Sequence, residues 1–90
     1  MHKFSTEDKL KIKLKKLFKK DRKTYEAVMS KIDEIVSSPD INHYKNLRKP
    51  LQNLKGVHIM KSFVLVFEYD KSQDLVNFYD FDHHDKIYKT

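Results

Sequence analysis

The 90-residue sequence contains no cysteine, which excludes disulfide bonds, thiolate nucleophiles, cysteine-bound zinc and iron–sulfur clusters. It has one glycine and two prolines, too few for a glycine-rich loop that cradles phosphates. Its longest apolar run, residues 63–67, is far shorter than the ~20 residues that a membrane helix needs. The N-terminus lacks the apolar core of a signal peptide. We therefore expect a cytoplasmic protein with no membrane partner.

The length fits a single domain over residues 1–90, since domains usually have ~100 to 200 residues. Hydrophobic residues make up 39% of the chain and include six Phe and five Tyr, which excludes the composition of a disordered protein. The formal net charge is +6, but it is unevenly spread. Residues 3–23 hold ten bases and three acids, whereas residues 64–90 hold three bases and six acids. A basic front of this kind favours an anionic partner such as nucleic acid. The alternative is a solvated helix face that lysines keep soluble.

Apolar side chains recur at helical spacing in two N-terminal segments. Leu10 is followed at i+4, i+7 and i+8 by Leu14, Leu17 and Phe18, which predicts a helix from Thr6 to Lys19 with Ser5 at its start. Residues 20–23 have no apolar side chain and are predicted to connect this helix to a second one. The second helix carries its own apolar stripe and ends near Ser37, because the residue before Pro39 is steered out of the helical region. We expect the two to form an antiparallel hairpin.

The pattern changes to β-strand in the second half. Three runs rich in β-branched and aromatic residues, 57–60, 63–69 and 75–81, predict an antiparallel meander. The run 63–69 is apolar on both faces and is predicted to be central. The run 75–81 carries Asn77 and Asp80, predicted on opposite faces, and is expected to be an edge strand. Residues 39–55 are predicted to be a loop with room for one short edge strand, and residues 82–88 a turn or short helix. The predicted fold class is α+β, a helix hairpin packed on a small antiparallel sheet.

Histidine is the residue type that points to chemistry. Of five histidines, His43, His58, His83 and His84 lie in or beside the β half. The unperturbed histidine pKa, ~6.5, suits proton transfer near neutral pH. His58 could instead be a half-buried structural residue, and only one of the adjacent His83 and His84 can face a given site. His2 is predicted to lie in a mobile tail.

Residues 82–85 (Asp-His-His-Asp) offer four potential metal ligands. Adjacent positions on a chain do not converge on one ion, so we predict no metal site there.

Together these features resemble the RelE/ParE toxin superfamily, and within it the YafQ-like messenger-RNA interferases of type II toxin–antitoxin systems. The resemblance rests on His43, residues 54–59, the pair 62–63, the strand 64–67 and residues 84–88. It implies a RelE-like fold and a catalytic set on these positions: His43, His58, Ser62, Phe63, His84 and Tyr88. Ser62 stands where the family has an acid, and Phe63 stands where it has a tryptophan.

The resemblance also implies an activity and partners. Family members cleave messenger RNA on the ribosome with no metal or other cofactor, use the RNA 2′-hydroxyl as the nucleophile, and are held by a cognate antitoxin. We expect the RNA backbone to be bound by seven basic residues: Lys13, Lys16, Lys20, Lys45, Arg48, Lys49 and Lys55. Two alternatives stay open. One is a non-catalytic RelE/ParE-fold member, either a gyrase inhibitor or an inactive toxin, and the other is a plain basic nucleic-acid-binding module.

Overall fold

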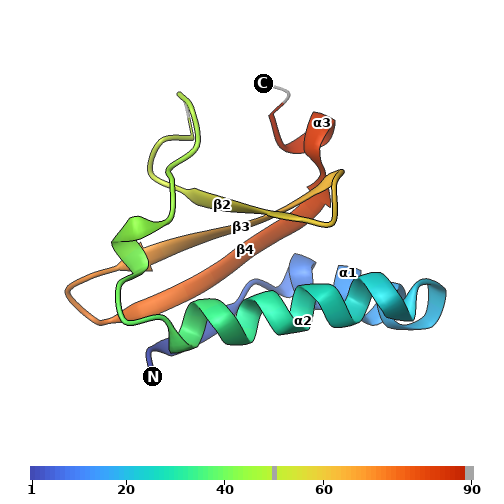
Figure 1. Cartoon of the computed structure of the whole chain (residues 1–90), viewed down its shortest axis with the longest axis horizontal. Helices are drawn as coiled ribbons and strands as arrows, with labels where there is room; N and C mark the ends of the chain where they lie inside the picture. The colour runs from blue at the N-terminus through green and yellow to red at the C-terminus, as the bar shows by residue number, and fades with distance from the viewer. Residues whose placement is uncertain (50, 89–90) are drawn as a thin grey trace.

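The computed structural model describes residues 1–49 and 51–88. The elements in chain order are β1 (Lys3–Thr6), α1 (Asp8–Lys20), α2 (Arg22–Ser37), the 3-10 turn η1 (Ile41–His43), β2 (Lys55–Ile59), β3 (Phe63–Asp70), β4 (Leu75–His83) and α3 (His84–Ile87). Helices α1 and α2 cover one face of a four-stranded sheet, while α3 and the loop after η1 rise from the other side (Figure 1). The α+β class and the helix hairpin are confirmed. None of the described helices is long and apolar enough to cross a membrane.

The hairpin turns more tightly than predicted, because Asp21 alone separates α1 from α2. Its carboxylate accepts hydrogen bonds from the Thr24 hydroxyl at 2.6 Å and the Thr24 backbone N–H at 3.1 Å. These two bonds lower the pKa of Asp21 below its ordinary value. A side-chain cap of this kind satisfies the free N–H groups of a helix start, so α2 can begin immediately after α1 ends.

The first residues form a strand, so the predicted helix start at Ser5 and Thr6 is wrong. Residues 3–6 make β1, which pairs in parallel with β4 from Lys3 opposite Leu75 to Thr6 opposite Phe78. The Ser5 hydroxyl donates to the Asn77 side chain at 2.8 Å instead of capping a helix. The partner strand lies about 70 residues away in sequence, and local patterning carries no signal for such a distant pairing.

The strand order β1-β4-β3-β2 places β4 inside the sheet, so the predicted edge position of residues 75–81 is wrong. The fourth strand is β1, whereas the loop between η1 and β2 contributes only an isolated bridge from Asn46 to Lys55 among its described residues. The β3–β4 register skips Tyr79. This bulge places Asn77 and Asp80 opposite Glu68 and Val66, which share a face, so the predicted opposite placement of Asn77 and Asp80 is also wrong.

The sheet is packed on both faces, and β3 is its central strand as predicted. The helix face buries twelve residues: Leu10, Val28, Ile32, Ile35, Val36, Ile41, Ile59, Leu65, Phe67, Val76, Phe78 and Phe81. The opposite face buries a smaller cluster: Leu47, Leu54, Val64 and Val66. Each fully buried side chain of this size contributes roughly 1.5 to 3 kcal/mol. The larger cluster fixes the helices on the sheet, and the smaller one fixes the loop after η1.

His2 is bound on both sides, so the prediction of a mobile tail is wrong. Its ring lies between the Asp74 carboxylate, at 2.5 Å from Nδ1, and the Ser38 carbonyl oxygen, at 2.6 Å from Nε2. Both partners are acceptors, so the ring satisfies both contacts only as the doubly protonated imidazolium. The hydrogen bond to Asp74 and then the one to Ser38 raise the pKa of His2. The same bond to His2 lowers the pKa of Asp74.

We expect the thermal stability of the protein to depend on pH through His2. A raised folded-state pKa stabilises the fold fully below the unfolded value of ~6.5, and this contribution is lost as pH rises through the folded-state pKa. Circular dichroism melts at about pH 6 and about pH 9 should therefore show a larger fall in Tm for the wild type than for His2→Gln. The variant His43→Gln keeps the His2 contacts and should fall like the wild type. Equal pH dependence in the wild type and His2→Gln would contradict this account.

Candidate active site

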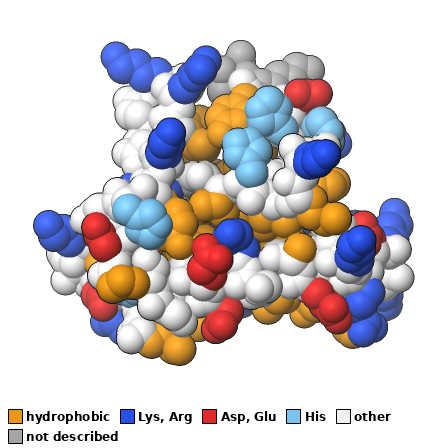
Figure 2. Space-filling view, viewed as in Figure 1, with side chains coloured by type: hydrophobic (Ala, Val, Ile, Leu, Met, Phe, Trp, Pro, Cys, Tyr) orange, Lys and Arg blue, Asp and Glu red, His pale blue; other side chains and the backbone are white. Residues whose placement is uncertain are grey.

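A pocket of about 600 Å³ lies on the sheet face opposite α1 and α2, between α3 and the basic loop of residues 45–49. We call it the histidine pocket; its lining residues are Lys45, Asn46, Leu47, Arg48, Lys49, Leu51, Gly56, His58, His84 and Tyr88. Figure 2 shows histidine side chains grouped beside lysine and arginine side chains in this upper part of the molecule. None of the described lining residues is acidic. The pocket has the size of sites that bind small ligands and a lining suited to anions.

Two histidines from distant segments meet in this pocket. His58 lies on β2, and His84 is the first residue of α3. Their ring centroids are 5.8 Å apart, with the ring planes inclined by 28°. The Tyr88 ring packs edge-on against His84 at 4.8 Å. His58 is exposed rather than half-buried. Three of the six predicted catalytic side chains are therefore brought together.

The start of α3 fixes which way His84 faces. The His84 backbone N–H donates to the Ser62 carbonyl oxygen at 2.7 Å. The preceding residue, His83, caps the helix by accepting from the Asp85 N–H at 3.2 Å, and its ring lies edge-on to Phe63 at 5.9 Å. The adjacent histidines thus face different surroundings, and only His84 enters the pocket, consistent with the expectation that one of the two faces a given site.

Gly56 allows the basic loop to approach the sheet. A Cβ atom at Gly56 would lie 2.7 Å from Leu47 Cδ2 and 3.2 Å from Val64 Cγ1, both too close. Lys55 next to it holds the loop, because its ammonium donates to the Tyr44 carbonyl at 3.0 Å and to the Asn46 side chain at 2.8 Å. Sequence reasoning missed Gly56 and Leu47 as pocket residues. The only glycine of the chain, placed directly before the predicted meander, was the available signal.

The other three predicted catalytic residues lie outside the histidine pocket. Phe63 points to the helix face, stacked on Phe81 at 5.2 Å, because it pairs with Ile59 and strand side chains alternate between faces. Ser62 lies in the β2–β3 turn and meets His84 through its backbone. His43 lies in η1, where its ring packs on Tyr44 at 4.0 Å and contacts the Asp40 carbonyl oxygen.

The predicted RNA-binding residues divide between two surfaces. Lys45, Arg48 and Lys49 line the histidine pocket, whereas Lys13, Lys16 and Lys20 lie on α1 around Phe81 and Asp82. The Lys13 ammonium reaches Asp80 at 2.8 Å and Asp82 at 2.9 Å. Burial lowers the pKa of Lys13, but its hydrogen bonds to these two carboxylates together raise it above the ordinary value. Lys13 thus ties α1 to the end of β4.

Within residues 1–49 and 51–88, no three histidine or carboxylate side chains lie close enough together to hold a metal ion. The nearest carboxylate to the paired histidines is Asp85, whose Oδ1 lies 3.3 Å from His84 Nδ1. The arrangement can support proton transfer by two imidazoles next to a cationic loop.

No protein-family model matches the chain. Over 76 residues it is 55% identical to a protein of Methanocaldococcus jannaschii named "Putative toxin RelE4", covering 84% of this chain and 79% of that protein. The chain belongs to the RelE toxin family.

Solved structures of RelE-family proteins share its fold. The chain superimposes on a chain of the RelBE2 toxin–antitoxin complex from Mycobacterium tuberculosis with a TM-score of 0.73 and 18% identity, over 92% of this chain and 91% of that one. It also superimposes on YafQ from Escherichia coli with a TM-score of 0.63 and 13% identity, over 98% and 99%. The RelE-like fold is confirmed, and the YafQ-like subtype stays a prediction.

The close packing at Gly56 gives a test of how the pocket is held. Gly56→Ala should lower the free energy of unfolding by about 1 kcal/mol, because the new methyl group overpacks the Leu47 contact. Leu47→Ala should cost more through the cavity that it leaves. In urea denaturation the double variant should lose less stability than the two single losses combined, since the smaller Leu47 side chain makes room. Additive losses would show that the two positions do not contact each other.

Proposed function

We propose that this RelE-family chain is the toxin of a type II toxin–antitoxin system and cleaves messenger RNA on the ribosome without a metal ion. The observation that carries the proposal is the stacked pair of His58 and His84, 5.8 Å apart, in a pocket lined by three bases. Cleavage of RNA through its own 2′-hydroxyl needs a base for the 2′ proton, an acid for the departing 5′ oxygen, and positive charge around the phosphorus.

The two histidines supply the proton transfers in this proposal. One imidazole takes the proton from the 2′-hydroxyl as its oxygen bonds to the phosphorus. The other, as imidazolium, gives a proton to the 5′ oxygen as the P–O5′ bond breaks. The products are a 2′,3′-cyclic phosphate and a 5′-hydroxyl, with no co-reactant consumed. Because the rings come from β2 and α3 and open into the same pocket, one phosphodiester can contact both.

Charge and packing complete the proposed site. Lys45, Arg48 and Lys49 stabilise the added negative charge on the phosphorane, and the Tyr88 hydroxyl can donate to a phosphate oxygen. Ser62, which stands where the family has an acid, lies outside this pocket, so its lack of a carboxylate leaves the paired histidines in place. Phe63 packs in the helix-face core, so base stacking in this proposal is assigned to Tyr88 rather than to Phe63.

The proposed partners follow from the family. The similar chain from Mycobacterium tuberculosis is part of a toxin–antitoxin complex, which supports a cognate antitoxin for this chain. The ribosome and messenger RNA are the proposed substrate assembly, and the cytoplasm is the proposed location.

We expect His84→Ala to abolish growth arrest on expression and to lower messenger-RNA cleavage by about 10²-fold or more, because proton transfer is lost. The matched control is His83→Asn, which changes the neighbouring histidine that faces Phe63 while keeping a side-chain helix cap. The control should keep both toxicity and cleavage. Primer extension on the message measures cleavage, and circular dichroism checks that both variants fold.

Two results would overturn the proposal. Undiminished cleavage by His84→Ala would remove the paired histidines from the chemistry. Intact message together with stalled replication would favour a gyrase-inhibiting member of the superfamily.

We expect Arg48→Gln to weaken binding of a short single-stranded RNA and to reduce the magnitude of the salt slope of log K by about 0.7, the value for one lost phosphate contact. Lys71→Gln is the comparison, because Lys71 lies in the β3–β4 turn, far along the chain from the pocket-lining segments. It should leave the slope unchanged. Fluorescence anisotropy at several salt concentrations gives both slopes, and equal slopes for the two variants would exclude Arg48 from the RNA contact.

A further inference from the structure

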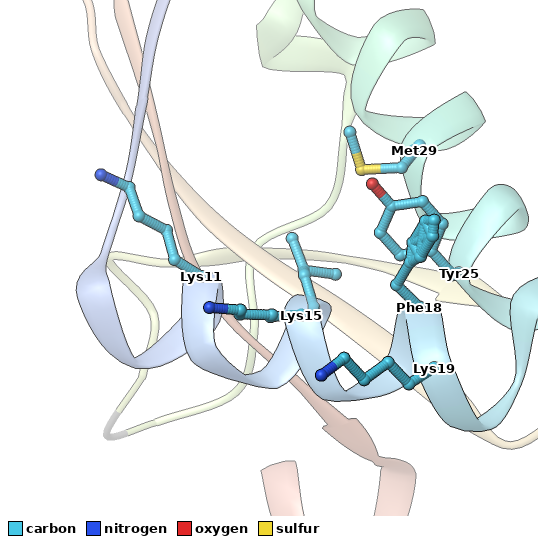
Figure 3. A pocket seen from close by; sticks show the side chains of 7 residues that line it. Lys11, Lys15, Phe18, Lys19, Tyr25 and Met29 are labelled. Carbon is cyan, nitrogen blue, oxygen red and sulfur yellow. The ribbon is translucent and has the colours of Figure 1, made fainter.

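The two hairpin helices carry more apolar surface than the sheet covers. On α1, Leu10 is fully buried, but Phe18 remains 37% exposed. On α2, Val28 is fully buried, but Met29 remains 39% exposed. These uncovered side chains meet in a groove of about 480 Å³ between α1 and α2, with the strands behind it (Figure 3). We call it the hairpin groove; its lining residues are Lys11, Leu14, Lys15, Phe18, Lys19, Tyr25 and Met29.

The apolar floor of the hairpin groove is already ordered. The Phe18 ring lies between two neighbours, with the Arg22 guanidinium 3.7 Å from its centroid and the Tyr25 ring 5.0 Å away. Leu14 is half-buried and packs against the core below. A partner therefore meets a fixed apolar surface and loses little free energy to rearrangement of the groove.

One rim of the groove is a row of cations. Lys11, Lys15 and Lys19 come from successive turns of α1 at four-residue intervals (Figure 3). Among the described residues, Lys15 and Lys19 have no ion-pair partner, and Lys11 only reaches Asp8 at 3.9 Å. No described lining residue is acidic. The three like charges repel one another, and an acidic ligand would relieve that repulsion.

We propose that the hairpin groove binds an acidic amphipathic helix of a partner protein. The stretch of α1 from Lys11 to Lys19 is roughly 12 Å long at 1.5 Å per residue, so a partner helix of about ten residues spans it. Apolar side chains at i, i+3, i+4 and i+7 enter the floor, and acids four residues apart face the three lysines. The Leu, Phe and Met floor disfavours nucleic acid, and the basic rim disfavours a second copy of this chain.

This binding leaves the histidine pocket open. The groove lies on the helix side of the sheet, and the pocket lies on the opposite face, beyond β3. A helix in the groove therefore holds the protein without blocking the proposed catalytic residues. The inference does not depend on RNA cleavage, because it rests on the groove alone.

The probe is a synthetic fourteen-residue helical peptide with Leu at i, i+3, i+4 and i+7 and Glu at three positions four residues apart. A matched peptide carries Gln in place of each Glu. Fluorescence anisotropy with the full chain should show the Glu peptide binding at least 10-fold more tightly than the Gln peptide, as expected for several ion pairs at the rim of an apolar interface. Equal binding would overturn the proposal.

Charge reversal in the protein locates the contact. Lys15→Glu/Lys19→Glu should weaken the Glu peptide about 10-fold or more. The matched control, Lys16→Glu/Lys20→Glu, makes the same change on the same helix outside the groove and should weaken it by less than about 3-fold. Equal losses would mean that the attraction is general charge, which overturns the proposal.

Two further measurements separate the groove from the histidine pocket. Met29→Gln should weaken the peptide, whereas Ile12→Gln, which changes an exposed apolar residue outside the groove, should not. A short RNA that binds the pocket should leave peptide binding unchanged, and displacement of the peptide by that RNA would overturn the proposal. If His84→Ala fails to affect RNA cleavage, the proposed function fails and these peptide results still stand.

Discussion

The antiparallel pairing of β3 with β4 is the interaction on which both surfaces of the protein depend. Residues 64–67 are buried, with Leu65 and Phe67 packed under the helices and Val64 and Val66 packed under the basic loop. Removing either cover would expose half of this strand to water. The same pairing carries the chain through β4 to α3, so it also delivers His84 to the pocket floor beside His58 on the other neighbour of β3.

The two faces of the sheet serve different purposes because they are covered differently. Two long helices and a twelve-residue buried cluster make the helix face a rigid scaffold. The opposite face has only a loop and a one-turn helix, so it retains a pocket. Its shape depends on Gly56, where the loop and the sheet approach too closely for a side chain, and on Lys55, which binds two loop oxygens. Basic charge and imidazole rings meet there from segments far apart in sequence.

Periodic elements could be predicted from the sequence, and isolated contacts could not. The apolar stripes gave both helices, and the alternating runs gave β2, β3 and β4, because such patterns report burial within a single element. β1 escaped notice since four residues with a partner about 70 positions away show no periodicity. The bulge at Tyr79 reversed the expected faces of Asn77 and Asp80 for a similar reason. His2 gained its role only from the convergence of Ser38 and Asp74.

The sequence by itself determined the α+β class, the hairpin, the central position of β3 and the family, because these depend on composition, spacing and shared residues. It also supplied the histidines, yet it could not select among them. Only the tertiary structure decided that His58, His84 and Tyr88 share a pocket while His43, Ser62 and Phe63 do not. It likewise committed Lys13 to an ion-pair network and left Lys15 and Lys19 beside an open apolar groove. The physical reason is that side-chain direction follows from strand register and helix rotation, which are set by contacts between distant segments.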